Sequence, residues 1–151
     1  MQQGDAIPAV TVKTANDEAL VLGDLAGPLV VYFYPKDDTS GCTREAQDFT
    51  ALAGEFAGAG VRVIGISKDS PAKHRKFSEK HALTVELASD EDGAACEAFG
   101  VWGEKKLYGK TYMGIERATF LFGRDGKLVQ SWRKVKVPGH AEAVLEAARA
   151  L

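Results

Sequence analysis

The stretch VVYFYPKDDTSGCTREAQDFTALAGEF, residues Val30–Phe56, predicts a buried strand, a polar turn and a helix in direct succession. The run Leu29–Tyr34 is apolar, β-branched and aromatic without strict alternation, which is typical of a strand that is covered on both faces of a sheet. Pro35 ends this strand, and turn and N-cap residue types occupy positions 37–41. Apolar residues then recur at helical spacing, so we expect Cys42 in the first turn of a helix.

A cysteine at the start of a helix is a candidate nucleophile, because the thiolate and not the thiol reacts. The free N–H groups and the partial positive charge of a helix N-terminus favour that anion. Arg44 lies nearby in the sequence but points away from Cys42 on a helix, so a stabilising cation is expected from elsewhere in the chain. The alternative interpretation is that Cys42 is an ordinary small apolar residue of the core.

The spacing Pro35-x-x-x-Thr39-x-x-Cys42 matches the active-site pattern of the peroxiredoxins, and YPKDDTSGCTREAQDF resembles their bacterioferritin-comigratory-protein, or PrxQ, subgroup. Residues 99–105 (FGVWGEK) and 108–117 (YGKTYMGIER) resemble the same subgroup. The similarity runs from about Gly4 to the C-terminus. The resemblance implies a thiol-dependent peroxidase that reduces hydrogen peroxide and organic hydroperoxides through a sulfenic acid on Cys42.

The resemblance also implies roles for the residues around the cysteine. The hydroxyl of Thr39 would contact the peroxide, and Pro35 would shield the thiolate from water. Arg117, which precedes a predicted central strand, matches the active-site arginine of the family, and its planar guanidinium could hold both the thiolate and a peroxide oxygen. Glu45, one turn after Cys42, would orient this polar network from behind.

Both charged residues have ordinary alternatives. Arg117 could be a surface charge that pairs with Glu116 or Asp125, and Glu45 could lie on a solvated helix face.

The sequence departs from the subgroup pattern at the residue that would return the sulfenic acid to the thiol. Many members of the subgroup carry a resolving cysteine five residues after the first, where this chain has Gln47. Cys96 is the only other thiol, and its apolar neighbours favour packing in the core over a resolving role. A disulfide between Cys42 and Cys96 would require local unfolding. We therefore expect a one-cysteine peroxidase reduced by thioredoxin, glutaredoxin or a low-molecular-weight thiol, with the two-cysteine enzyme as the alternative.

The 151 residues, 45% hydrophobic and 26% charged, are expected to form a single domain over residues 1–151. The net charge of −2 argues against nucleic acid or an anionic membrane as a partner. Two widely spaced cysteines and an N-terminus without a signal-peptide pattern favour a reducing cytoplasm. No long apolar helix face is apparent, which favours a monomer.

The remaining elements follow from local patterns. A hairpin is expected around Asn16 and Asp17, an ordered loop that crosses near the active site over 101–114, and strand or helix elsewhere. The expected strands lie at 61–67, 118–122 and 127–132, and the expected helices run from Ser70 to Lys80, from a Ser89-Asp90 cap to Gly100, and from His140 onward. This order is that of an α/β, thioredoxin-like fold, a central mixed sheet flanked by helices, with an N-terminal β extension.

Other chemistries find less support in the sequence. His74, His81 and His140 are expected on polar helix faces, without the spacing of a metal site, and the peroxidase chemistry requires no cofactor. A thioredoxin-type disulfide reductase would need a cysteine at Thr39. A non-enzymatic redox sensor or interaction module on the same fold would use the same sulfenic acid, and catalytic turnover separates it from an enzyme.

Overall fold

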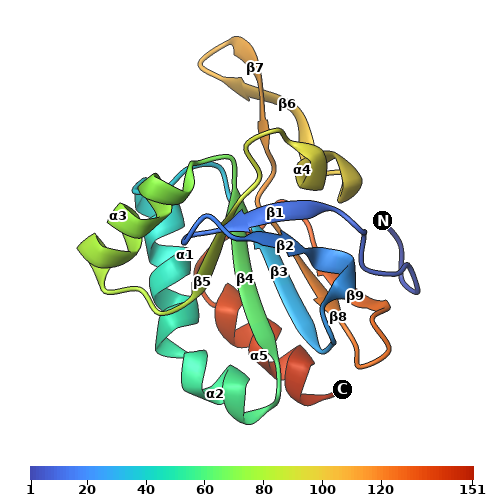
Figure 1. The fold of residues 1–151 in the computed structure, drawn as a ribbon. Helices are drawn as coiled ribbons and strands as arrows, with labels where there is room; N and C mark the ends of the chain where they lie inside the picture. The colour runs from blue at the N-terminus through green and yellow to red at the C-terminus, as the bar shows by residue number, and fades with distance from the viewer.

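A seven-stranded mixed sheet runs through the centre of the computed structural model, which describes residues 1–151 (Figure 1). Its strand order is β2-β1-β5-β4-β3-β8-β9. The strands are β1 (Thr11–Thr14), β2 (Ala19–Val21), β3 (Leu29–Phe33), β4 (Arg62–Ser67), β5 (Glu86–Ser89), β8 (Ala118–Phe122) and β9 (Leu128–Trp132). The helices are α1 (Ser40–Ala51), α2 (Ala53–Gly58), α3 (Pro71–His81), α4 (Ala94–Ala98) and α5 (His140–Arg149), with a short 3-10 turn at Leu22–Asp24.

Strand β3 lies between β4, which is parallel to it, and β8, which is antiparallel. All five of its residues are buried, as its unbroken apolar sequence predicted. Val31 and Phe33 belong to one core cluster, and Val30 and Tyr32 belong to the cluster on the opposite face. The centre of the sheet is therefore covered on both sides.

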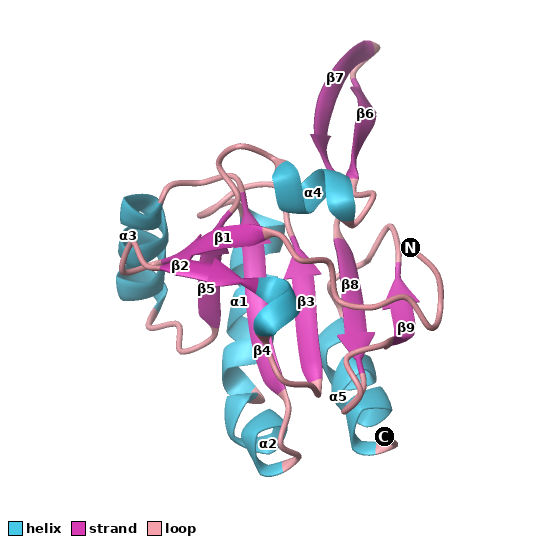
Figure 2. Cartoon of the chain, turned by 45° about the vertical axis from the view of Figure 1, so that its right-hand side comes forward, coloured by secondary structure: helices cyan, strands magenta, loops and turns pink.

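The helices divide unequally between the two faces. Residues of α1, α2, α3 and α5 form one core cluster with Tyr32, and Figure 2 shows α1, α2 and α5 behind the strands. Helix α4, the 3-10 turn and the N-terminal segment cover the other face. The predicted thioredoxin-like order is confirmed, with the β1–β2 hairpin as the N-terminal extension.

The segment 101–114, expected as an ordered loop, instead forms most of a second, two-stranded sheet. Strands β6 (Trp102–Leu107) and β7 (Lys110–Ile115) pair only with each other and project away from the central sheet in both views (Figures 1 and 2). Tyr108 and Gly109 make the turn, both with positive φ, at 51° and 75°. The loop prediction was wrong because Tyr-Gly is not one of the usual hairpin dipeptides and the strands have little buried surface.

Two helix boundaries test the capping predictions. Helix α3 begins as expected after Ser70, whose hydroxyl accepts a hydrogen bond from the Lys73 N–H. Helix α4 begins after Gly93, so the predicted Ser89-Asp90 start was too early. The Asp90 carboxylate nevertheless caps this helix, because it accepts hydrogen bonds from the backbone N–H groups of Ala95 and Cys96.

Gly65 on β4 provides a test of packing in the sheet. A Cβ atom at this position would lie 2.4 Å from the ring of Tyr32 on the neighbouring strand. We expect Gly65→Ala to lower the free energy of unfolding by about 1–3 kcal/mol, because the buried ring must shift. Gly54→Ala is the matched control, since a Cβ there meets nothing within 4 Å on helix α2, and it should stabilise by about 0.5–1 kcal/mol. Chemical denaturation checks both values, and equal effects would contradict the packing argument.

Candidate active site

Cys42 is the third residue of α1 and its side chain is almost fully buried, with 2% of its surface exposed. The first hydrogen bond of the helix runs from the Thr43 N–H to the Thr39 carbonyl. The N–H groups of Gly41 and Cys42 therefore have no acceptor within the helix, and Thr39 makes no side-chain cap with them. The predicted position at a helix N-terminus is confirmed, and its donors favour negative charge there.

Arg117 supplies the cation beside Cys42, because Arg44 on α1 is exposed and pairs with Asp48 instead. Its Nη2 donates to the Cys42 Sγ at 3.3 Å, and its Nη1 donates to the Glu45 Oε1 at 2.6 Å. Ala118 pairs with Phe33 across β8 and β3, so Arg117 lies beside the end of β3 from which the cysteine loop departs. The charges of Glu45 and Cys42 outweigh the effect of burial and raise the pKa of Arg117.

The close approach of this guanidinium depends on a glycine. A Cβ atom at Gly41 would lie 3.2 Å from the Arg117 Nη2. Any larger side chain at position 41 would therefore crowd the guanidinium from the first turn of α1. The sequence identified Gly41 only as a turn residue.

The ordinary alternatives for Arg117 and Glu45 are both wrong. Glu116 pairs instead with Arg133, at 2.6 Å between its Oε2 and the arginine Nε. Asp125 accepts a hydrogen bond from the backbone N–H of Lys127 in the β8–β9 turn. Glu45 is 1% exposed, far from a solvated face.

Glu45 lies in a poorly solvated position beneath the thiol. Burial raises its pKa to about 7, although Arg117 opposes this shift. Its Oε2 has no hydrogen-bond partner, and neither has the hydroxyl of Tyr32, which is also buried. The carboxyl therefore holds Arg117 by one oxygen only.

Thr39 and Pro35 lie on the exposed side of the cysteine loop. The Thr39 hydroxyl donates to the Lys36 carbonyl at 2.9 Å, and the structure gives it no hydrogen bond to Cys42. The structure thus brings both residues into the loop that leads to the thiol, and their predicted contacts with peroxide stay predictions.

Two histidines that the sequence placed on polar helix faces are buried. His74 is fully buried under the cysteine loop, with its Nδ1 2.6 Å from the Asp37 Oδ2. His140 is 7% exposed, and its Nε2 lies 2.8 Å from the hydroxyl oxygen of Thr119. Burial and the charge of Arg117 lower the pKa of His140 to about 4.

Helical spacing contained the signal for both histidines. Pro71, His74 and Phe77 recur every three residues and form the buried face of α3. His140 stands four residues before Val144 on the buried face of α5. The third histidine, His81, does lie nearer the surface, where its Nε2 is 2.8 Å from the Asp38 Oδ1.

Lys105 of β6 is a neighbour of the site that the sequence did not single out. Burial and then the charge of Arg117 lower its pKa, whereas Cys42 raises it. Lys105, in the middle of β6, therefore contributes a positive charge to the surroundings of the thiol. No sequence signal distinguished Lys105 from the other lysines of this segment.

Cys96 lies on the other face of the sheet from Cys42. It is fully buried in the core cluster that contains Phe33 and Phe99, whereas Cys42 belongs to the cluster that contains Tyr32. Burial, and then Asp90, raises the pKa of the Cys96 thiol. The structure keeps both cysteines free and does not bring them together.

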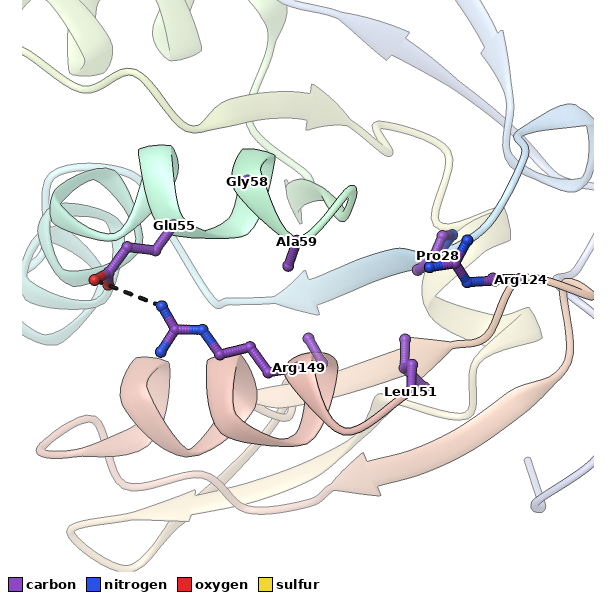
Figure 3. A pocket seen from close by; sticks show the side chains of 8 residues that line it. Pro28, Glu55, Gly58, Ala59, Arg124, Arg149 and Leu151 are labelled. Atoms are coloured by element: carbon purple, nitrogen blue, oxygen red, sulfur yellow. Dashed lines mark ion pairs between the residues drawn. The ribbon is translucent and has the colours of Figure 1, made fainter.

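The other features of the chain are separate from this arrangement. A hollow of about 440 Å³ lies between α2, α5 and the start of β3, and Figure 3 shows Arg149 reaching Glu55 across it, at 3.6 Å. None of the predicted site residues lines it.

Among residues 1–151, no group of three or more His, Cys, Asp or Glu side chains could hold a metal ion. No helix combines the length and the apolar character that a membrane crossing requires.

Relatives of known family match nearly the whole chain. Peroxiredoxin Bcp of Xanthomonas campestris is 54% identical over 122 residues, which are 81% of this chain and 76% of the relative. Peroxiredoxin Bcp of Bacillus subtilis is 46% identical over 144 residues, 95% of this chain and 92% of the relative.

Solved structures of proteins from the same subgroup also match the chain. The bacterioferritin comigratory protein of Xanthomonas campestris, studied for its alkyl peroxide reduction activity, has a TM-score of 0.89 and 47% identity, covering 97% of this chain and 98% of that one. A PrxQ variant of Xylella fastidiosa has a TM-score of 0.92 and 39% identity, covering 99% and 96%. The model of the AhpC/TSA family matches residues 3–131. The chain therefore belongs to the AhpC/TSA family, and within it to the peroxiredoxins of the bacterioferritin-comigratory-protein subgroup.

Proposed function

We propose that this protein is a thiol-dependent peroxidase that reduces hydrogen peroxide and organic hydroperoxides at Cys42. The observation that carries the proposal is the 3.3 Å contact between the Arg117 Nη2 and the Cys42 Sγ at the start of α1. A cysteine held between a guanidinium and free helical N–H groups is in a setting that favours the reactive thiolate.

The reaction is a displacement at oxygen. The Cys42 thiolate attacks one oxygen of R–O–O–H, an S–O bond forms, and the O–O bond breaks. The leaving oxygen takes a proton and departs as R–OH, and Cys42 becomes a sulfenic acid. Negative charge moves from sulfur to the departing oxygen, so donors are needed on both sides of the reacting centre.

Arg117 can donate hydrogen bonds both to the Cys42 sulfur and to the departing oxygen. One N–H donor on each terminal nitrogen is used, toward Cys42 and toward Glu45, and the fork retains further donors for a peroxide oxygen. Glu45 acts as a positioning residue, because it holds the guanidinium from the buried side. The absence of a side chain at Gly41 leaves room for the guanidinium against the helix start.

Thr39 and Pro35 would complete the site from the solvent side. Because the Thr39 hydroxyl donates its proton to the Lys36 carbonyl, its oxygen is available to accept a hydrogen bond from the O–H of the hydroperoxide. That contact would orient the distal oxygen toward the thiolate. Pro35, which has no N–H to solvate, would form the outer wall.

An external thiol returns the sulfenic acid to Cys42 in this proposal. Cys96 is buried on the opposite face of the sheet, so both cysteines would have to leave their core clusters to meet. The reductant would be thioredoxin, glutaredoxin or a low-molecular-weight thiol. A two-cysteine enzyme and a non-enzymatic redox sensor are the alternatives, and the experiments below separate them.

We further infer that residues 1–151 act as one domain, a monomer in the cytoplasm. Strands from both ends of the chain share one sheet, which supports a single domain. Two free cysteines on opposite faces are compatible with a reducing compartment. The net charge of −2 gives no support for nucleic acid or an anionic membrane as a partner.

Replacement of the two reacting side chains tests the peroxidase proposal. Cys42→Ser should abolish peroxide turnover with an added thiol reductant. Arg117→Ala should slow the oxidation of Cys42 by about 100-fold or more, because a transition-state donor is lost. Arg44→Ala is the control, since Arg44 is exposed on the same helix and pairs only with Asp48. Stopped-flow oxidation and coupled turnover assays measure these effects, and normal turnover in Cys42→Ser would exclude the enzyme.

The mass of the oxidised protein identifies the resolving thiol. Reduced protein treated with one equivalent of hydrogen peroxide, without other thiols, should gain about 16 Da at Cys42 when trapped at low pH. Cys96→Ala should show the same gain and unchanged turnover with the external reductant. A loss of about 2 Da that disappears in Cys96→Ala would instead assign Cys96 as the resolving cysteine.

The buried carboxyl of Glu45 predicts a pH dependence of stability. Its pKa is about 7 in the folded protein and near 4.5 when exposed, so the fold favours the protonated form. This contribution is complete below about pH 4.5 and is lost as the pH rises through 7. The wild type should therefore lose roughly 3 kcal/mol of unfolding free energy relative to Glu45→Gln over that range. Glu55→Gln, at an exposed carboxyl, is the control, and parallel pH profiles for wild type and Glu45→Gln would contradict this account.

A further inference from the structure

A buried polar network lies directly beneath the cysteine loop. The Tyr34 hydroxyl donates to the Asp37 Oδ1 at 2.5 Å, and the Asp37 Oδ2 lies 2.6 Å from the His74 Nδ1. The His74 Nε2 lies 3.0 Å from the Ala88 carbonyl oxygen. These side chains are between 0% and 8% exposed, so water contributes little to their hydrogen bonding. None of these residues takes part in the proposed peroxidase mechanism.

The protons of this network can be placed from its acceptors. A carbonyl oxygen only accepts, so the His74 Nε2 must carry a hydrogen and donate it to Ala88. The short contact between the Nδ1 and the Asp37 Oδ2 then requires one further proton between these two atoms. Whichever atom holds that proton, the pair as a whole is neutral. Asp37 and His74 thus share one proton in a site where neither charge would be stable alone.

The network joins the loop to three other elements of the fold. His74 comes from α3, and the Ala88 carbonyl comes from β5. The Asp37 N–H donates to the Asp69 Oδ2 at 2.8 Å, and the same oxygen accepts from the Ser67 hydroxyl at the end of β4. Asp37 is therefore held through both its backbone and its side chain.

The next residue of the loop is fixed to the same helix. Asp38 has a positive φ of 61°, and its carboxylate accepts from the Lys80 Nζ at 2.7 Å and lies 2.8 Å from the His81 Nε2. Two consecutive loop residues are thus attached to α3, one in the core and one at the surface. The exposed pair is the weaker of the two attachments, because solvent screens it.

This attachment lies only a short way along the chain from the reacting groups. Thr39 follows Asp38 directly, and its carbonyl accepts the first hydrogen bond of α1. A displacement of Asp37 would therefore move the Thr39 hydroxyl and the helical N–H groups relative to Arg117, which directly precedes β8. Positional errors near 1 Å at a reacting centre are enough to reduce the rate of catalysis strongly.

We propose that Asp37 and His74 are positioning residues for peroxide reduction, a proton-sharing pair that holds Thr39 and the start of α1 in place against Arg117. The inference rests on the proposed peroxidase function. The physical reason is that hydrogen bonds are directional. A pair of apolar residues could fill this space with equal stability, but only hydrogen bonds fix the orientation of the loop.

The test compares two reactions of the same thiol. Both reactions need the Cys42 thiolate, but in the proposed mechanism only the oxidation by hydrogen peroxide also needs the Thr39 hydroxyl in position, whereas alkylation by iodoacetamide does not. In His74→Gln and in Asp37→Asn, we expect the oxidation rate to fall at least 10-fold and the alkylation rate to change less than about 3-fold. Because the two residues act as one unit, the double variant should lose little more than either single variant.

Two further variants separate positioning from general stability. Val144→Ala removes buried volume on α5, so it should lower the melting temperature without changing the ratio of the two rates. Tyr34→Phe removes only the hydroxyl that donates to Asp37 and keeps the ring. It should lower the ratio about 3-fold, and it decides the question if the His74 and Asp37 variants do not fold.

The outcomes are distinct. An unchanged ratio of oxidation to alkylation in the folded variants would overturn the positioning role and leave a purely structural pair. Independent, additive losses in the double variant would overturn the proton-sharing unit. Failure of the wild-type protein to react with hydrogen peroxide would instead refute the proposed function, and a wild-type control in every series makes the two failures distinguishable.

Discussion

The antiparallel pairing of β3 with β8 is the constraint on which the site depends. It brings together residues that are 75 positions apart, because Ala118 opposite Phe33 places Arg117 at the strand end from which the Cys42 loop leaves. Both strands are completely buried in the middle of the sheet, so their register is fixed by packing on two faces. The contact between guanidinium and sulfur is thus a consequence of sheet geometry.

Burial of charge around that contact is balanced locally. Arg117 is desolvated, but it faces Glu45 and the sulfur of Cys42, and a free arginine in this place would be costly. Burial raises the pKa of Glu45 to about 7 although Arg117 opposes the shift, so its carboxyl lies between two protonation states near neutrality, with one oxygen bonded and the other without a partner. In the buried Asp37–His74 pair, a shared proton makes the pair neutral, so no net charge is buried there.

The sequence was sufficient where several local signals agreed. The strand, turn and helix from Leu29 to Ala51 combined an apolar run, proline and turn residues, and the structure follows them closely. The β6–β7 hairpin could not be recognised because it buries little surface and therefore has little apolar periodicity.

The histidines were misplaced for another reason. Histidine is a polar residue type and by itself indicates a polar face, although His74 and His140 recur with apolar neighbours on one helix face. Their partners, Asp37 and Thr119, lie on other elements, and only the three-dimensional arrangement makes a buried histidine acceptable. The contact of Arg117 with Glu45 likewise joins segments that no local pattern connects.

The separation of the two cysteines by the sheet has a kinetic consequence. If an external thiol resolves Cys42, as proposed above, a sulfenic acid there has two fates: capture by a reductant that diffuses in, or a second encounter with peroxide that gives the sulfinic acid. Their relative rates depend on the concentrations of two dissolved species. The number of catalytic cycles before inactivation would then be a property of the surroundings, and it would fall whenever peroxide rises faster than the reductant is regenerated.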